Sequence, residues 1–366
     1  MSFLSDRLLD QIRSEGPITF CQWMKAALYD PHYGYYCRSD RARWGREGDY
    51  RTSPERSELF AATFARYFAK LYEELGSPSS WTIVEVGAGA GHFAAELLGT
   101  LQHRFPGIFS ATQYVLDEAS ADSRAGVGHL LAPFSTHIKF QRLEELQPLD
   151  HAVIFSNELL DAFPVHRVTV QGGQLCEFYV DVNEKGDFNW LIGAPSTERL
   201  AYHFTRMGFQ PTEGRIAEIN LEVEDWLALV AQKIREGYLI SVDYGAEASD
   251  LYSSPERQDG TLRAFHRHRL IDDVLACPGE QDITSTIDWS FLKMLGKKHG
   301  FEVIDFARLD RFLLSADLLL EMEARLSEAA NESQRTRLSI AARAMILPQE
   351  MASSFSVLVQ KKGGGQ

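Results

Sequence analysis

The sequence has few cysteines and no close pair of them. Its 366 residues include Cys21, Cys37, Cys176 and Cys277, and none belongs to a C-x-x-C motif. This spacing argues against a zinc site, a redox motif or a disulfide framework, and it fits a reducing compartment. We therefore expect four buried free thiols and no bound metal.

Long apolar runs and targeting segments are also missing. No apolar stretch approaches the roughly 20 residues that a membrane-spanning helix needs. The first ten residues contain two aspartates and read as the start of an amphipathic helix, without the apolar centre of a signal peptide. We expect a cytoplasmic, bacterial protein without membrane insertion.

Positive charge is in deficit. The chain has 37 basic and 51 acidic residues, a formal net charge of -14. Nucleic-acid backbones attract clustered lysine and arginine, so we expect no nucleic acid as a partner. A DNA adenine methyltransferase is also disfavoured, since no Asn/Asp-Pro-Pro-aromatic motif follows the strand predicted over Ala152–Phe155. A basic peptide would suit this surface better.

The most informative motif is a glycine-rich turn after a β-branched strand. Glu85 precedes Gly87, Gly89 and Gly91, and the position of the third dinucleotide-binding glycine holds His92. A nicotinamide dinucleotide is thereby disfavoured. S-adenosylmethionine (SAM) lacks a phosphate but still needs close backbone approach, which glycines allow. The motif therefore predicts a SAM site; the alternative is a tight turn that only packs a helix on a sheet.

A second predicted strand, Gln113–Leu116, ends in Asp117 and Glu118. A carboxylate at the end of a neighbouring parallel strand can accept hydrogen bonds from both ribose hydroxyls. Strand alternation turns only one of the two acids toward the ligand, and we select Glu118. A solvent-exposed carboxylate is the alternative for either residue.

The strand predicted over Ala152–Phe155 leads into Asn157, Glu158 and Asp161. Open α/β sheets place their chemistry at such strand ends, so these three are the candidate catalytic residues, and Asn157 is also a candidate cofactor contact. The alternative is a helix that starts at Asn157, capped by its amide and favoured by the two acids.

A further cofactor contact is predicted before the helix expected from Ser57 to Leu75. Thr52 and Pro54 stand at its start, where backbone N–H groups could meet the carboxylate of SAM; an ordinary helix cap is the alternative. The polar, arginine-rich stretch Arg38–Arg46 is predicted to be a mobile loop that closes over the ligand.

The pattern of elements divides the chain into five parts. A helix over Ala217–Glu236 is expected to precede the buried strand Tyr238–Val242. The predicted parts are an N-terminal cap that also covers the cofactor (1–79), the first part of a SAM-binding core (80–164), an inserted, β-rich substrate region of hairpins (165–215), the rest of the α/β core (216–360) and a disordered tail (361–366).

Several segments, taken in order, resemble one family, the MidA-like SAM-dependent methyltransferases, which include a mitochondrial complex I assembly factor that acts as a protein arginine methyltransferase. The segments are Gly16–Phe20, Leu28–Tyr36, Gly48–Tyr50 with Thr52–Glu55, Glu85–Gly91, Asn157–Pro164, Asp243–Gly245 and Pro278–Thr284.

The resemblance implies an α/β, class I, Rossmann-like methyltransferase fold with a mostly parallel seven-stranded sheet. It places Gly87, Gly89, Gly91 and Glu118 at the cofactor and implies methyl transfer to a protein arginine, with a respiratory complex I subunit as the family's substrate. It also assigns Glu85 to the turn near the methionine end of SAM.

An arginine acceptor stays protonated and needs carboxylates to hold it and favour proton loss, which Glu158 and Asp161 could do. Two alternatives stay open: a small-molecule methyltransferase, and a SAM-binding assembly factor without turnover.

Overall fold

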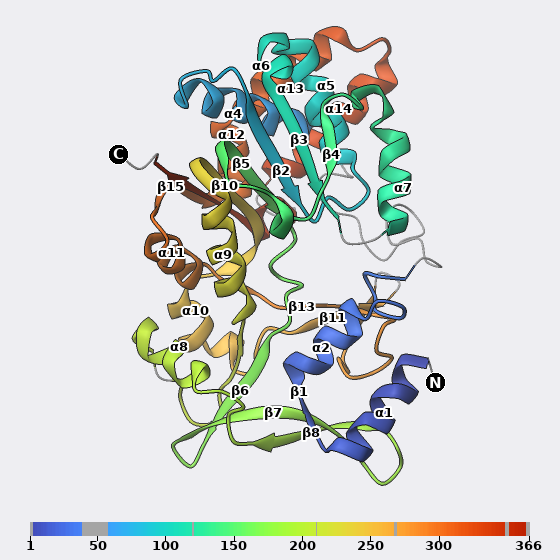
Figure 1. Ribbon diagram of the computed structural model, residues 1–366, viewed down its shortest axis with the longest axis vertical. Coiled ribbons are helices and arrows are strands. Elements are labelled where there is room, and N and C mark those ends of the chain that lie inside the picture. Colours follow the sequence, from blue (N-terminus) through green and yellow to red (C-terminus); the bar gives the residue numbers. More distant parts are fainter. Residues whose placement is uncertain are drawn as a thin grey trace. The chain divides into compact units, whose positions relative to one another are not determined.

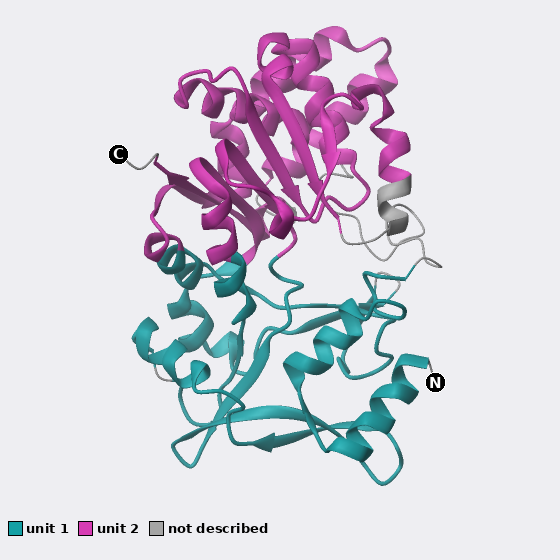
Figure 2. Ribbon diagram, viewed as in Figure 1, with its two compact units in different colours: residues 1–50, 160–226, 245–295 teal, residues 51–159, 227–244, 296–366 magenta. Residues whose placement is uncertain are grey.

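The computed structural model describes residues 3–38, 58–118, 121–209, 211–266, 269–347 and 351–363. The predicted mobile loop Arg38–Arg46 lies outside them except for its first residue. The chain forms two compact units and returns to each of them (Figure 2). Unit 1 contains residues 1–50, 160–226 and 245–295, and unit 2 contains 51–159, 227–244 and 296–366.

Unit 2 is built on one mixed sheet (Figure 1). Its strands run in the spatial order β15 (Phe301–Arg308), β16 (Phe355–Lys362), β10 (Ile234–Ala246), β5 (Leu149–Asn157), β2 (Trp81–Val86), β3 (Thr112–Asp117) and β4 (Ile138–Phe140). The five strands from β10 to β4 pair in parallel, and β16 is antiparallel to both of its neighbours. The predicted Rossmann-like, mostly parallel sheet is confirmed.

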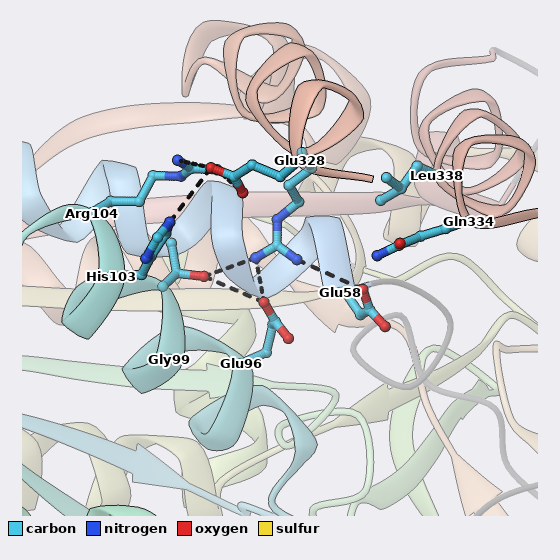
Figure 3. Close-up of a pocket in the computed structure, with 10 residues that line it drawn as sticks. Glu58, Glu96, Gly99, His103, Arg104, Glu328, Gln334 and Leu338 are labelled. Atoms are coloured by element: carbon cyan, nitrogen blue, oxygen red, sulfur yellow. Dashed lines mark hydrogen bonds and ion pairs between the residues drawn. The ribbon is translucent and has the colours of Figure 1, made fainter. Parts of the chain in front are cut away.

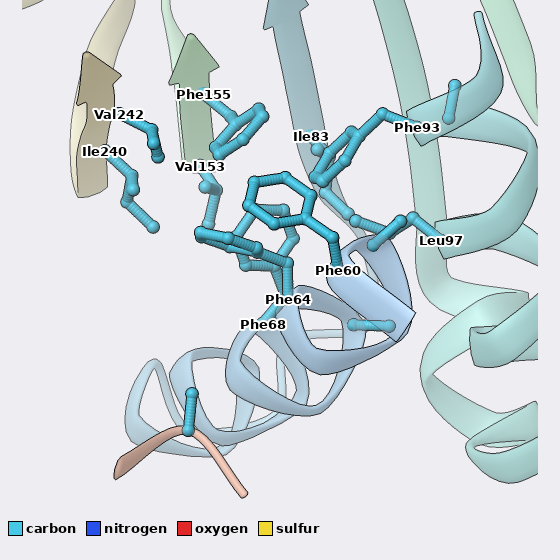
Figure 4. Packing of buried hydrophobic residues seen from close by; sticks show 14 of the residues in the cluster. Phe60, Phe64, Phe68, Ile83, Phe93, Leu97, Val153, Phe155, Ile240 and Val242 are labelled. Carbon is cyan, nitrogen blue, oxygen red and sulfur yellow. The ribbon is translucent and has the colours of Figure 1, made fainter. Parts of the chain in front are cut away.

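Helices complete unit 2. They are α4 (Glu58–Glu74), α5 (His92–Arg104), α6 (Pro106–Ala111), α7 (Ala121–Leu130), α12 (Leu309–Ser315), α13 (Leu318–Glu328) and α14 (Glu332–Ile346). Helix α4 presents phenylalanines to one sheet face (Figure 4). The Phe64 ring lies 5.1 Å from Phe155 of β5 and 5.4 Å from Phe312 of α12. Alternate strand residues such as Val153 and Phe155 supply this face, as the two-residue period of a strand requires.

Unit 1 contains a smaller antiparallel sheet. Its strands are β1 (Ile18–Thr19), β6 (His166–Gln171), β7 (Gln174–Val182), β8 (Phe188–Gly193) and β9 (Ile216–Ile219). The predicted hairpins are therefore present, and Gly172 and Gly173 adopt positive φ at the tight turn between β6 and β7.

Helices and short strands complete unit 1. The helices are α1 (Phe3–Glu15), α2 (Phe20–Tyr29), α8 (Arg199–Met207) and α10 (Ala248–Ser253). The short strands β11 (Arg263–His266), β12 (Arg269–Ile271) and β13 (Asp282–Thr284) form a separate antiparallel sheet, and β14 (Ile287–Asp288) pairs in parallel with the end of β10. Two helices cross the boundary between the units along the chain, α9 (Glu222–Lys233) and α11 (Trp289–Lys298).

The helix predicted over Ala217–Glu236 is only partly correct. Residues Ile216–Ile219 form β9, which pairs with β6, and the helix α9 begins at Glu222. Buried and partly exposed side chains alternate along β9, so the available partner strand decided its conformation. The prediction of a disordered tail from residue 361 is also wrong in part, because Lys361 and Lys362 pair with β10.

The cysteines are unpaired, but they are not fully buried as predicted. Cys277 is exposed and the other three are partly exposed. Among the residues that the structure describes, no helix is long and apolar enough to cross a membrane, and no cluster of histidine, cysteine or carboxylate side chains could hold a metal ion.

Candidate active site

Three neighbouring strands of unit 2 end at the same level. Val86, the last residue of β2, is paired with Asp117 of β3 on one side and with Ser156 of β5 on the other. The next residues along these strands are Gly87, Glu118 and Asn157. The parallel sheet therefore collects at one edge three positions that are distant in sequence, and this edge is where open α/β sheets bind ligands.

The glycine turn has a backbone that other residues would strain. Gly87, Gly89 and Gly91 have φ values of 75°, 54° and 76°, in the left-handed region. A Cβ on Gly91 would lie 2.7 Å from Cγ1 of Val127, and one on Gly87 would lie 3.1 Å from Cδ1 of Leu159. The turn thus needs glycine both for its conformation and for clearance, and Gly91 then starts helix α5.

The two acids at the end of β3 have different surroundings. Glu118 accepts a hydrogen bond from the Gly89 backbone N–H at 3.0 Å, so its carboxylate lies against the turn. The buried Asp117 instead accepts from the Leu143 N–H at 2.9 Å and forms a 3.0 Å ion pair with Arg142. Of these neighbours, Glu118 stays the candidate for a ligand contact at the turn, and Asp117 holds the following loop.

Glu85 lies within unit 2 and is 5% exposed. Its Oε2 accepts a hydrogen bond from the Tyr114 hydroxyl at 2.7 Å. Burial raises the pKa of Glu85 to about 8, although the Tyr114 bond acts in the opposite direction. At neutral pH this carboxyl group is therefore largely protonated, and it links β2 to β3 just before the turn.

No helix starts at Asn157, so the helix-cap alternative is wrong. The chain bends from Glu158 onward, and Glu158 adopts a left-handed φ of 50° that does not continue into a helix. Its N–H donates to the Val242 carbonyl at 2.9 Å. A non-glycine residue held in this region costs about 1–2 kcal/mol, and such strain is commonly found at functional sites.

The Asn157 side chain has one satisfied and one unsatisfied end. Its Nδ2 donates to Glu158 Oε1 at 3.2 Å, whereas its Oδ1 is buried without a hydrogen-bond partner among the described residues. A buried acceptor without a donor is costly, and a bound N–H group would satisfy it. Asn157 and Glu158 therefore form a small polar pair beside the glycine turn.

The remaining predicted site residues are Asp161, Thr52 and Pro54. Asp161 is buried in unit 1, where its backbone carbonyl accepts from the Ser285 N–H at 2.9 Å. The boundary between the units falls after Leu159, so Asp161 belongs to a different unit from Glu158. Thr52 and Pro54 lie outside the described residues.

The structure adds one acid that our site prediction omitted. Val242 of β10 is paired with Asn157, so the next residue, Asp243, continues the same edge of the sheet. Asp243 is 1% exposed and accepts a hydrogen bond from the Tyr244 N–H at 2.8 Å. The sequence pattern that indicated Glu118, an acid at the end of a buried strand, was also present at Asp243.

A separate polar pocket of about 190 Å³ in unit 2 lies among α4, α5, α13 and α14 (Figure 3). Its charges are largely paired with one another. Arg104 pairs with Glu328 at 2.9 Å, and Arg325 pairs with Glu58 at 3.7 Å. Both arginines also contact the fully buried carboxylate of Glu321, at 3.3 Å and 3.0 Å, which Arg66 contacts at 2.6 Å. This network explains how α13 is fixed to α4 and α5, and it does not require a ligand.

The family of the chain follows from its sequence. The profile of a protein family described as "Putative S-adenosyl-L-methionine-dependent methyltransferase" matches residues 63–307, about two thirds of the chain. The chain belongs to this family. The matched region contains the glycine turn, Glu118 and the Asn157–Glu158 pair. The resemblance to MidA-like methyltransferases is confirmed.

Similar proteins agree with this assignment. A crystal structure from Burkholderia thailandensis with bound S-adenosyl-homocysteine is 27% identical, has a TM-score of 0.86, and is matched over 99% of this chain and 92% of that one. The Drosophila melanogaster protein arginine methyltransferase NDUFAF7 homolog is 26% identical over 81% of this chain and 70% of its own length. The corresponding Rattus norvegicus protein is 24% identical over 95% of this chain and 82% of its own length.

The protein is a SAM-dependent methyltransferase, and its cofactor is SAM. The residues at the edge of the sheet fit this cofactor. The glycine turn offers backbone clearance, Glu118 lies on the turn, and the unpaired Oδ1 of Asn157 can accept from an amino group. SAM carries both a ribose and an amino group, so both acceptors would find donors.

Proposed function

We propose that this methyltransferase modifies arginine side chains of a protein. The observation that carries the proposal is the Asn157–Glu158 pair, which offers a carboxylate and an unsatisfied amide oxygen next to the glycine turn. A guanidinium group has five N–H donors and seeks such planar acceptors. The names of the Drosophila and Rattus relatives, both protein arginine methyltransferases, support the same substrate class.

The chemistry needs positioning more than a strong nucleophile. SAM supplies an electrophilic methyl group when bound. Glu158 is proposed to hold the protonated guanidinium, to align one nitrogen and to accept the proton that this nitrogen loses as the N–C bond forms. Asn157 orients Glu158 through the 3.2 Å hydrogen bond. Asp161 is retained as the proposed second carboxylate for the acceptor.

The test is methylation of a protein extract from cells that lack this gene. Radiolabelled SAM and purified enzyme are added, the proteins are hydrolysed, and methylated arginines are separated from other products. We expect label in methylarginine. The Glu158→Gln variant keeps the shape of the side chain, so it should bind SAM but lose transfer. Undiminished turnover by this variant would remove Glu158 from the mechanism.

Two other results would redirect the assignment. Label that appears only in small molecules would identify a small-molecule methyltransferase. SAM binding without any transfer would leave a SAM-binding assembly factor. We further propose a respiratory complex I subunit as the acceptor, a suggestion that rests on the family resemblance; the labelled proteins, identified by mass spectrometry, would exclude it if none belongs to that complex.

A further inference from the structure

An open groove of about 720 Å³ crosses unit 1. One wall is helix α1, the second is the turn between β7 and β8, and the third is the loop that contains the family motif Pro278–Thr284. The apolar lining consists of the partly exposed Phe188 and of Leu9, Leu275 and Pro278, which are buried and form the base of the walls. These three segments are distant in sequence, and the proposed chemistry uses none of them.

The third wall has a fixed shape. The buried Gln281 side chain donates to the carbonyls of Val274, at 2.9 Å, and Ala276, so it holds the loop from inside. Gly279 has a φ of 81°, and a Cβ there would collide with the Tyr33 carbonyl. The wall is thus built by specific contacts and does not need a ligand to form.

The lining of the groove is acidic. Asp187 and Asp273 are both exposed, and neither makes an ion pair within the part of the chain that the structure describes. The third acid, Glu280, lies 3.7 Å from Arg38. Arg13 is the nearby cation at the β7–β8 turn, beside Gly186. Among the described residues, these two exposed carboxylates form no ion pair.

Exposed aromatic rings border the same loop. Phe3 is 76% exposed and Tyr33 is 39% exposed, and their rings stack with centroids 5.8 Å apart. The backbone carbonyl of Tyr33 lies close to Gly279, in the loop that forms the third wall. Arginine combines a charge for carboxylates with a flat face for aromatic rings, whereas lysine offers only the point charge.

We propose that this groove binds an extended, arginine-containing segment of the acceptor protein, outside the residue that is methylated. The proposal deepens the proposed function and rests on it for the identity of the partner. Apolar contact with the partly exposed Phe188 would hold the chain, and Asp187 and Asp273 would select positive charge. The acceptor is then recognised through its flanking sequence.

The probe is a fluorescein-labelled peptide of about 15 residues with four arginines separated by glycine and phenylalanine. Its binding to the full-length protein is measured by fluorescence anisotropy at low salt, without SAM. The double variant Asp187→Asn, Asp273→Asn removes both charges, and asparagine retains the acceptor that Asp273 offers to the Leu275 N–H at 3.0 Å. We expect about tenfold weaker binding, and less difference at high salt.

A matched control is Glu73→Gln, Glu302→Gln, which removes two exposed carboxylates of unit 2 and gives the same net charge. It should bind the peptide like the parent protein. If peptide binding is weakened equally in both double variants, the attraction depends only on net charge, and the groove proposal is rejected. A peptide with glutamine in place of arginine should bind neither protein.

Location is tested independently at Cys277, the exposed thiol in the groove lining. Bound peptide should slow alkylation of Cys277 at least severalfold, measured by mass spectrometry, and leave the rate at Cys176 unchanged. Binding without protection of Cys277 would place the peptide elsewhere and overturn the proposal.

The two proposals fail in different ways. If the peptide binds and protects Cys277 but no protein acquires methylarginine, the groove proposal stands and arginine methylation is rejected. If the Asp187→Asn, Asp273→Asn variant methylates an acceptor protein on arginine with unchanged KM and kcat, arginine methylation stands and the groove proposal is rejected.

Discussion

Replacing Glu85 by glutamine should change how the stability of the protein depends on pH. Burial raises the pKa of Glu85 from 4.5 to about 8 in the folded protein. The folded state therefore holds this proton over a pH range in which the unfolded chain has lost it. Ionisation of Glu85 stabilises the unfolded state in this range. The free energy of unfolding therefore falls as pH rises from about 4.5 to about 8, and the contribution of Glu85 to it is constant above that range.

The magnitude follows from the shift. Each pKa unit corresponds to about 1.4 kcal/mol, so the wild-type protein should lose at most about 4 kcal/mol between pH 5 and pH 9 through this group. Glutamine is nearly isosteric, cannot ionise and can still accept the hydrogen bond from Tyr114. The variant should resemble wild type near pH 5 and become the more stable protein at pH 9.

Urea unfolding at several pH values, followed by tryptophan fluorescence, measures this difference. The comparison between variant and wild type cancels the other titrating groups. Tyr114→Phe is the matched control, because it removes the hydrogen bond that lowers the pKa of Glu85 and leaves the carboxyl group in place. Its pH dependence should be at least as steep as that of wild type. Parallel stability curves for wild type and Glu85→Gln would refute a protonated Glu85.

Three further changes test the site and its support. Gly89→Val places a β-branched side chain at a φ of 54° on the turn, so calorimetric titration should show that SAM binding is lost; micromolar binding would contradict the turn as the SAM site. Glu118→Gln should weaken SAM by about 2 kcal/mol, roughly thirtyfold, through loss of a charged acceptor, and an unchanged Kd would show that Glu118 does not contact the cofactor. Glu321→Ala leaves three arginines around an empty site and should cost about 3–5 kcal/mol in urea unfolding, with the Kd for SAM unchanged; a loss below about 1 kcal/mol would rule out a structural role for this network.

Local patterns were sufficient for the strands of unit 2 that lead to the candidate site. The β-branched strand before Gly87 and the acid that ends β3 were evident from the sequence, because strand periodicity and glycine requirements act within a few residues. The edge of the sheet that holds Glu118 and Asn157 then followed from the general behaviour of parallel sheets. The family resemblance was also available at this level.

Other features depended on contacts that no local pattern contains. Residues Ile216–Ile219 became a strand because β6 offers a partner, although helix followed nearby. Asn157 did not cap a helix because the Glu158 N–H bonds to the Val242 carbonyl, 84 positions further along the chain. Both outcomes reflect tertiary hydrogen bonds that outweigh local propensity.

The sequence by itself determined the cofactor class and the residues of the glycine turn, since the turn depends on left-handed backbone at Gly87, Gly89 and Gly91 and on clearance at Gly87 and Gly91. Tertiary structure alone decided that Asp243 continues the edge of the sheet beside Asn157, that Glu85 is buried against Tyr114, and that three separate segments form one acidic groove. Burial, strand register and the meeting of distant segments are properties of the folded chain, because each depends on contacts between residues far apart in sequence.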